Sequence, residues 1–228
     1  MSSEASESTS VVPQPTLQGP AEDGTELLLI RHGRSADVVP GSEEALDPPL
    51  HDDGVRQAHA LAARLAGRRL DAVYASHLAR AVETARPLAE ARGLAVEIHR
   101  DLEEVRLGEW GQGEFRRRAA ARDPEWVAWS RTGRWDGIPG GEGDEAFRRR
   151  VTDVISELAA RHTGGTIALV AHGGTINAFV AEVLGIPRSL WLVVENTSVT
   201  VVRSSPFGHT VVVAGDCSHL YDPVVGPA

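Results

Sequence analysis

Two segments of this chain share one design. The segments at 27–33, "LLLIRHG", and at 166–174, "TIALVAHGG", each run an apolar stretch directly into a histidine and a glycine. Continuous apolar runs of this length are typical of strands buried on both faces of a parallel sheet. In open α/β sheets, ligands bind outside the carboxyl ends of the strands. The pattern therefore predicts that His32 and His172 lie at one ligand-binding edge of one sheet.

The rest of the chain alternates helix-like and strand-like segments. Apolar residues at helical spacing predict helices at 53–66, where Asp52 is the expected cap, and at 77–93, 144–161 and about 175–184. Short apolar runs predict further strands at 71–76 and 94–99. This order predicts an α/β fold, a three-layer sandwich in which helices flank a central, mostly parallel sheet.

Two other parts of the chain complete the expected domain. The β-branched runs at 197–202 and 209–214 predict two more strands, and the short turn around Pro206-Phe207-Gly208 allows an antiparallel edge strand. The segment 102–143 is the least regular and holds four of the five tryptophans. We interpret these tryptophans as packing residues of a core or a lid.

The distribution of charge separates a tail from a body. The first 26 residues hold five acidic side chains and no basic one, and they are rich in Ser, Pro and Gly. We expect residues 1–25 to form a disordered acidic tail and residues 26–222 to form one domain. The tail supplies five of the nine net negative charges, which leaves a mildly acidic body and argues against general nucleic-acid binding.

Composition limits the chemistry further. The single cysteine, Cys217, excludes an intramolecular disulfide framework and a cysteine-rich metal site, and it favours a cytoplasmic location. No apolar run approaches the roughly 18 residues that span a bilayer, so we expect no membrane partner. All 23 basic residues are arginine. The absence of lysine excludes Schiff-base catalysis, whereas arginine suits bidentate recognition of phosphate.

Charged residues near the predicted sheet edge favour an anion site. Arg31 precedes the first histidine, and Arg80 follows the strand predicted at 71–76. Gly33 and Gly173 allow the backbone to approach a ligand closely. Two arginines and two histidines at one edge form a phosphate-sized pocket, and neutral imidazole is also a nucleophile. The acids that could protonate a leaving group are Glu103, Glu104 and Glu109 in "DLEEVRLGEW".

Six ordered segments resemble one known family. They are "LIRHGRS", "DPPLHDDGVRQA", "YASHLARAVETA", "LEEVRLGEW", "PGGEGDEAFRRRV" and "LVAHGG", and they span about residues 27–184. The chain resembles the histidine phosphatase superfamily, the phosphoglycerate mutase-like proteins, and its phosphatase branch in particular.

The resemblance implies a role for each matching residue. His32 matches the histidine that is transiently phosphorylated, and Glu104 matches the acid that protonates the leaving group and then activates water. Arg31, Arg80 and His172 match the residues that hold the phosphoryl oxygens, and Ser35 and Gly173 are further candidates for contact with phosphate. For Ser35, capping of a helix or turn is an equal alternative, and Arg80 could instead pair with Glu83 on its own helix.

The chain also departs from the family pattern. Arg34 stands where the family often has Glu or Gln, and Val38 stands where it often has Asn. "GEWGQ" replaces the more usual "GEWEG". The two "FRRR" runs, at 115–118 and 147–150, are interpreted as solvated helix faces rather than as a nucleic-acid surface.

We therefore expect a phosphomonoester hydrolase that acts on a small phosphorylated substrate without a metal or cofactor. The alternatives are a phosphoglycerate mutase-type phosphotransferase, with Arg34 as the argument for it, and a catalytically weak relative that binds phosphorylated ligands or a protein. A two-histidine metal hydrolase lacks a ligand cluster such as HxxxH or HxH. A homodimer is left open.

Overall fold

Successive side chains of the first strand point to opposite faces of a sheet. In the computed structural model, which describes residues 24–221, Leu27 and Leu29 belong to one hydrophobic cluster, whereas Leu28 and Ile30 belong to a second. All four side chains are at most 1% exposed. Because side chains alternate along a strand with a period of two, this arrangement requires cover on both faces of the sheet.

The sheet has six strands in the order β3-β2-β4-β1-β5-β6. Strands β3, β2, β4 and β1 are parallel, whereas β5 pairs antiparallel with β1 and β6 pairs antiparallel with β5. The predicted mostly parallel sheet with an antiparallel edge is thus confirmed. The strands are β1 (Thr25–Arg31), β2 (Ala72–Ala75), β3 (Val96–Ile98), β4 (Thr166–Ala171), β5 (Val199–Ser205) and β6 (Gly208–Asp216).

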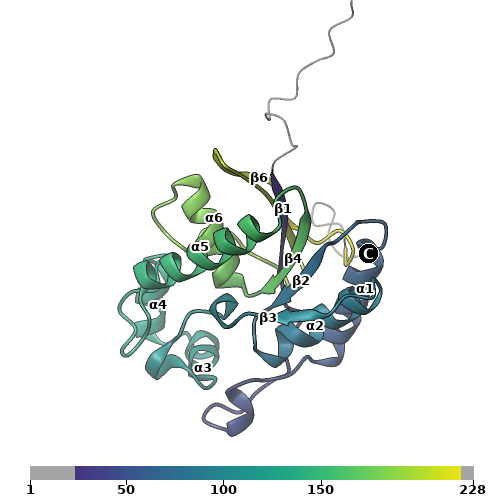
Figure 1. Ribbon diagram of the computed structural model, residues 1–228. Coiled ribbons are helices and arrows are strands. Elements are labelled where there is room, and N and C mark those ends of the chain that lie inside the picture. The colour runs from purple at the N-terminus through teal and green to yellow at the C-terminus, as the bar shows by residue number, and fades with distance from the viewer. Residues whose placement is uncertain (1–23, 222–228) are drawn as a thin grey trace, which may run out of the picture.

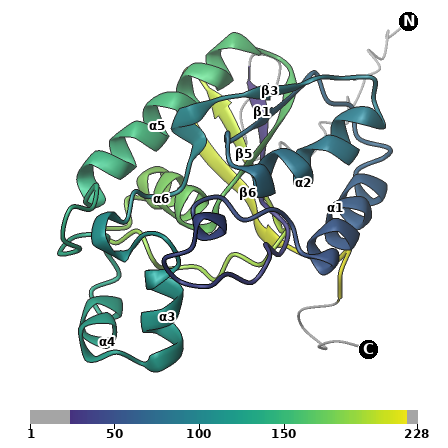
Figure 2. The same ribbon diagram turned by 90° about the horizontal axis from the view of Figure 1, so that it is seen from below.

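Helices cover both faces of the sheet, as Figures 1 and 2 show. Helices α5 (Asp144–Arg161) and α6 (Gly173–Leu184) pack on the face of Leu27 and Leu29, and α1 (Asp52–Arg64) and α2 (Ala79–Glu90) pack on the other. This confirms the predicted three-layer sandwich. Within residues 24–221, no helix has both the length and the apolar character that crossing a membrane requires.

The observed ends of the elements differ from the expected ones by a few residues. The helix predicted to begin near 175 starts at Gly173. The prediction missed this start because the first turn contains two glycines, which are poor helix formers. Asp52 does not cap α1: His51 does, its Nδ1 accepting a hydrogen bond from the Asp53 N–H at 3.1 Å. The predicted helix 144–161 matches α5 at both ends.

The boundary of the predicted tail also shifts. Strand β1 already begins at Thr25, whose side chain is 3% exposed and donates a hydrogen bond to the Ala159 carbonyl at 2.7 Å. Thr25 therefore belongs to the folded domain. The remaining tail residues, 1–23, and residue 222 lie outside the described residues.

The irregular segment 102–143 forms a small helical lobe. It contains η4 (Gly108–Trp110), α3 (Glu114–Ala121) and α4 (Pro124–Ser130), and η3 (Arg100–Leu102) leads into it. Trp110, Trp129 and Trp135 are at most 8% exposed and pack edge-on or tilted against one another. The tryptophans therefore build the core of this lobe, as predicted, and the lobe lies beside the carboxyl ends of the parallel strands (Figure 2).

Candidate active site

The two predicted histidines meet at the carboxyl edge of the sheet. Strands β1 and β4 are adjacent and parallel, with Arg31 opposite Ala171, so the next residue of each strand is a histidine. The rings of His32 and His172 lie 5.1 Å apart between centroids at an angle of 61°. Both side chains are buried, with exposures of 7% and 0%. The register of two neighbouring strands is therefore enough to bring this pair together.

Hydrogen bonds hold the His32 ring in one orientation. Its Nδ1 lies 2.7 Å from the Gly33 carbonyl oxygen, which can only accept, so Nδ1 carries the proton of the neutral ring. The unprotonated Nε2 then faces Arg80, whose Nε donates to it at 3.3 Å. The Asn196 side chain donates to the His32 carbonyl at 2.8 Å. Nε2 is thus the nitrogen that is available to attack an electrophile.

Both histidines are kept neutral by their surroundings. Burial lowers the pKa of His32 well below its usual value of 6.5, and the positive charges of Arg80 and Arg31 lower it further. Burial also lowers the pKa of His172 well below 6.5, with the neighbouring His32 and Arg80 acting in the same direction. At neutral pH the His32 imidazole is therefore unprotonated at Nε2, as a nucleophile must be.

His172 is oriented from the other side. Its Nε2 lies 2.9 Å from Ser76 Oγ, which already accepts the Leu78 N–H at 3.3 Å. The Ser76 hydroxyl can donate to Nε2 or accept from it. The other ring nitrogen, Nδ1, is buried and has no hydrogen-bond partner among the described residues. In the tautomer in which Ser76 donates to Nε2, Nδ1 carries the proton of the neutral ring and is a buried donor that fits an anionic ligand.

Two predicted arginines flank the histidines. Arg31 Nη1 donates to the Val194 carbonyl at 2.5 Å, while its Nε is buried without a partner among residues 24–221. Arg80 Nη1 lies 3.7 Å from Asp47 Oδ1, while Arg80 Nε donates to His32. Burial lowers the pKa of both guanidinium groups, and the negative charge of Glu104 opposes that lowering. Both groups remain cations, so the edge carries concentrated positive charge.

The alternative that Arg80 pairs with Glu83 is wrong, because Arg80 contacts His32 and Asp47 instead. Glu83 accepts the Leu50 N–H at 2.7 Å and so ties the loop before α1 to α2. The next residue, Thr84, accepts the Gly33 N–H at 2.9 Å. An added Cβ on Gly33 would lie 2.7 Å from the Gly54 carbonyl oxygen, so this contact requires a glycine. These contacts fix the backbone directly after His32.

The two neighbouring glutamates have different surroundings. Glu104 Oε2 accepts the Gly174 N–H at 3.0 Å, at the first turn of α6, and its charge acts on Arg31 and Arg80. Glu103 instead binds Arg106 Nε at 2.7 Å. An added Cβ on Gly174 would lie 2.3 Å from Glu104 Oε1, so the second glycine of "HGG" makes room for this carboxylate. Gly173, the glycine that was predicted to contact a ligand, is the first residue of α6 and lies beside the Arg31 side chain.

A further arginine at the site was missed by the sequence reasoning. Arg116 on α3 donates to Ser35 Oγ at 2.9 Å and to the Ala36 carbonyl at 3.1 Å, and its positive charge lowers the pKa of His32. The "FRRR" run at 115–118 is thus a solvated face only in part. Arg117 and Arg118 pair with Glu114, on the same helix.

Arg34 is turned away from this set. Its Nη1 binds Asp53 Oδ2 at 2.5 Å, and its Nη2 lies 3.5 Å from Asp37 Oδ2. Neither acid lines the cavity that lies between the site and the helical lobe. The charge of Arg34 is therefore compensated by Asp37 of its own loop and by Asp53 in the first turn of α1.

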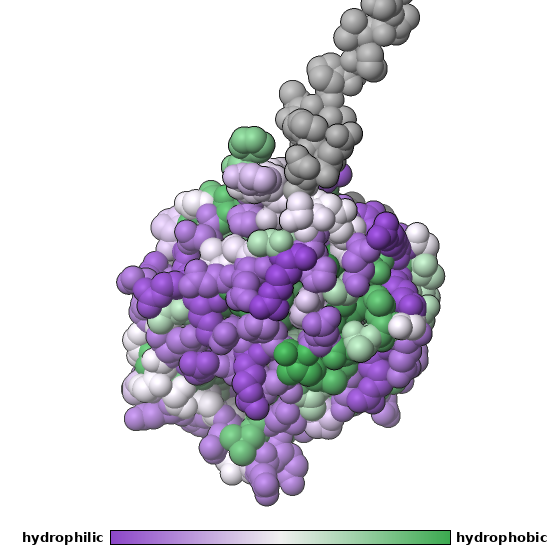
Figure 3. All heavy atoms as spheres, in the orientation of Figure 1, coloured by the Kyte–Doolittle hydropathy of each residue, from purple (hydrophilic) through white to green (hydrophobic). Residues whose placement is uncertain are grey.

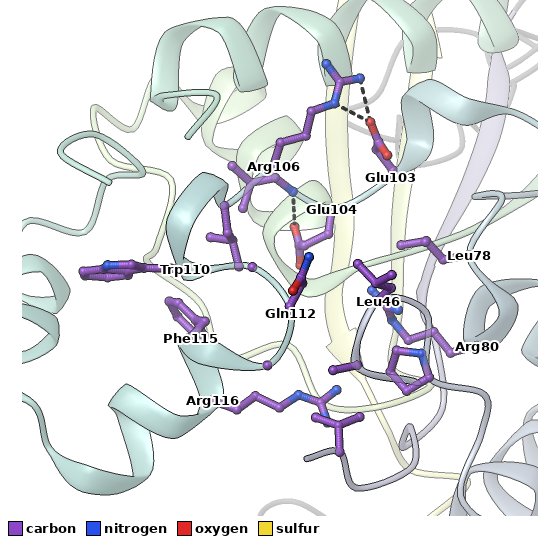
Figure 4. A pocket seen from close by; sticks show the side chains of 17 residues that line it. Leu46, Leu78, Arg80, Glu103, Glu104, Arg106, Trp110, Gln112, Phe115 and Arg116 are labelled. Carbon is purple, nitrogen blue, oxygen red and sulfur yellow. Dashed lines mark hydrogen bonds and ion pairs between the residues drawn. The ribbon is translucent and has the colours of Figure 1, made fainter. Parts of the chain in front are cut away.

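A cavity of about 440 Å³ opens between these residues and the helical lobe (Figure 4). Arg80, Glu104 and Arg116 lie on its wall, and Leu46, Leu78, Leu107 and Phe115 supply much of the apolar surface. Val39 and Leu46, in the loop between β1 and α1, are 72% and 58% exposed. Figure 3 shows hydrophobic atoms on the part of the surface that protrudes at the bottom of the view. The cavity is large enough for an organic leaving group.

Comparison with known proteins assigns the class that this fold and site define. The family model of the histidine phosphatase superfamily (branch 1) matches residues 27–216, and the chain belongs to this superfamily. It is similar to adenosylcobalamin/alpha-ribazole phosphatase of Salmonella typhimurium, with 34% identity over 72% of this chain and 83% of the relative. It is also similar to phosphoglycerate mutase-like protein 4 of Arabidopsis thaliana, with 34% identity over 87% of this chain and 88% of the relative.

Among solved structures, a mycobacterial glucosyl-3-phosphoglycerate phosphatase in complex with inorganic phosphate is similar. It matches with a TM-score of 0.72 and 30% identity, over 85% of this chain and 98% of that one. The protein is thus a histidine phosphatase, a phosphomonoester hydrolase of the class that works through a phosphohistidine.

Proposed function

We propose that the protein hydrolyses phosphomonoesters of uncharged organic alcohols, with His32 as the nucleophile. The observation that carries this proposal is the orientation of His32, whose Nε2 is held unprotonated among Arg31, Arg80 and His172. His32 Nε2 attacks phosphorus, and the bond from phosphorus to the ester oxygen breaks. Arg31, Arg80 and His172 hold the phosphoryl oxygens as charge shifts in the transition state.

Glu104 moves the proton in both half-reactions. Glu104 donates a proton to the leaving ester oxygen, which departs as an alcohol. The resulting carboxylate then takes a proton from water, and this water attacks the phosphohistidine and releases inorganic phosphate. The position of Glu104 supports this role, because its carboxylate lies at the cavity beside Arg80, whereas Glu103 is paired with Arg106.

Arg116, from the lobe, and Ser35, from the loop after β1, extend the phosphate site. Arg116 is bound only to uncharged oxygens, of Ser35 and Ala36, in the described residues, so its positive charge is free to attract an anion. The pairing of Arg34 with Asp53 and Asp37 removes the main argument for a mutase, which needs a second anion site. The apolar wall of the cavity favours an uncharged leaving group.

A panel of phosphomonoesters tests the proposal. We expect release of inorganic phosphate in the presence of a chelator, because no step in this mechanism uses a metal. Incubation with 3-phosphoglycerate and its bisphosphate activator should give little 2-phosphoglycerate. Efficient isomerisation with little release of phosphate would refute the hydrolase assignment. The cytoplasmic location, the absence of nucleic-acid partners and the possible homodimer stay predictions.

A further inference from the structure

We propose that Gln112 determines substrate specificity: its side-chain amide binds a second polar group, such as a hydroxyl, on the uncharged leaving group. The inference rests on the proposed function, because it places the leaving group in the cavity beside Glu104. Gln112 lies in "GEWGQ", the segment that departs from the pattern the chain otherwise resembles.

The ionic side chains of the cavity have partners, whereas the side-chain amide of Gln112 has none among the described residues. The ionic side chains on its wall all have partners within the fold, and they are Arg80, Glu103, Glu104, Arg106 and Arg116. Gln112 is exposed and its side-chain amide has no hydrogen-bond partner among residues 24–221, so the amide is accessible to a ligand, and Figure 4 shows it pointing into the cavity toward Glu104. An amide offers two N–H donors and one acceptor, which complement a hydroxyl.

The backbone at Gln112 is strained. Its φ is +49°, in the left-handed region that residues other than glycine rarely adopt. The loop at 38–41 packs against the backbone here. The Gln112 carbonyl accepts the Gly41 N–H at 2.9 Å, and an added Cβ on Gly113 would lie 3.2 Å from Val38 Cγ2 and from Pro40 Cα. Strain of this kind persists where the surroundings impose it and is concentrated at ligand sites.

The charges around Gln112 indicate the chemistry of the group that it binds. Arg106 is neutralised by Glu103, to which its Nε donates at 2.7 Å. Arg80 and Arg116 contact His32 and Ser35, on the phosphate side of the cavity. A carboxylate at the Gln112 end would therefore meet no uncompensated cation there. An uncharged hydroxyl exchanges its hydrogen bonds with water for bonds with the amide, at little desolvation cost.

Matched esters measure this interaction. The probes are n-alkyl phosphates and ω-hydroxyalkyl phosphates of three to six carbons, whose leaving groups differ only at the far end. For each length, the ratio of kcat/KM for the hydroxyalkyl ester to that for the alkyl ester is measured in the wild type and in Gln112→Leu. We expect the ratio to fall about fivefold in Gln112→Leu at one chain length, the usual effect of losing one neutral hydrogen bond.

Two glycine variants separate the side chain from the strain. Gln112→Gly removes both, so it should lose the same selectivity without a lower Tm. Arg122 has a φ of +48° at the end of α3, away from the cavity lining, and Arg122→Gly should leave the ratio unchanged. Hydrolysis of the esters with the same ratio in all variants would overturn the role of Gln112 and leave the phosphatase assignment intact. Absence of hydrolysis of every ester would overturn both.

Discussion

The Nε of Arg80 lies 3.3 Å from the Nε2 of His32, so the nitrogen that attacks phosphorus in our proposal rests against a guanidinium N–H. Arg80 lowers the pKa of His32 from this position, and in our proposal it also holds a phosphoryl oxygen. One side chain therefore serves both the protonation state of the nucleophile and the charge of the transition state.

Replacement of Arg80 should slow catalysis strongly. We expect Arg80→Ala to lower kcat/KM by about 10²–10³, because it removes a preorganised group that stabilises developing charge. The matched control is Arg149→Ala: Arg149 is exposed on α5, and its side chain lies 3.9 Å from Glu145. Steady-state kinetics with a single aryl phosphate, together with the Tm of each variant, would check this. A loss of less than about fivefold in Arg80→Ala would contradict it.

The proton donor can be identified from the dependence on leaving group. Glu104→Gln should slow alkyl phosphates far more than activated aryl phosphates, whose leaving groups depart without a proton. Glu103→Gln is the control, since Glu103 is paired with Arg106. Equal losses for both kinds of ester in Glu104→Gln would show that Glu104 only supports the fold. Gly174→Ala should reproduce the loss, because the new Cβ collides with the Glu104 carboxylate.

Arg116 should act on binding of the anion. We expect Arg116→Ala to raise KM about tenfold with a smaller change in kcat, since the charge is exposed and lies at the mouth of the cavity. The effect should shrink as salt is added, because exposed charges are screened. Arg117→Ala, on the same helix but paired with Glu114, should change neither constant. The opposite ranking of the two variants would disprove a role for Arg116.

The two buried histidines should make the fold sensitive to acid. Their pKa values are lowered well below 6.5 in the folded state, so the unfolded chain binds more protons once the pH falls below about 6.5. The free energy of unfolding should therefore decrease on acidification, by up to about 1.4 kcal/mol per pH unit for each histidine. Denaturant unfolding between pH 7.5 and 5.5 measures the slope. His172→Gln should reduce it, and an equal slope in this variant would rule out His172 as a contributor.

Much of the fold and the centre of the site were accessible from sequence for one physical reason. The apolar runs before His32 and His172 specify two buried parallel strands, and adjacent parallel strands bring the residues after their ends together. The sequence contains no comparable signal for Arg116. The three consecutive arginines at 116–118 look alike in the sequence, and only the position of α3 within the lobe turns Arg116 toward Ser35.

The position of Gln112 was equally hidden. A left-handed backbone conformation is expected at glycine, and nothing in "GEWGQG" distinguishes Gln112 from its glycine neighbours as the strained residue. The role of Arg34 was ambiguous for a different reason. Its partner Asp37 lies in the same long loop and its partner Asp53 lies after that loop, on α1, so their pairing with Arg34 depends on how the loop folds.

The most direct test of the account is to trap the intermediate. The enzyme is mixed with a ³²P-labelled phosphomonoester, quenched within milliseconds, and digested for mapping of the label. We predict an acid-labile, base-stable phosphoryl group on the peptide that contains His32, formed at least as fast as turnover and absent from His32→Ala. Full activity of His32→Ala, or a label on any other residue, would contradict the account.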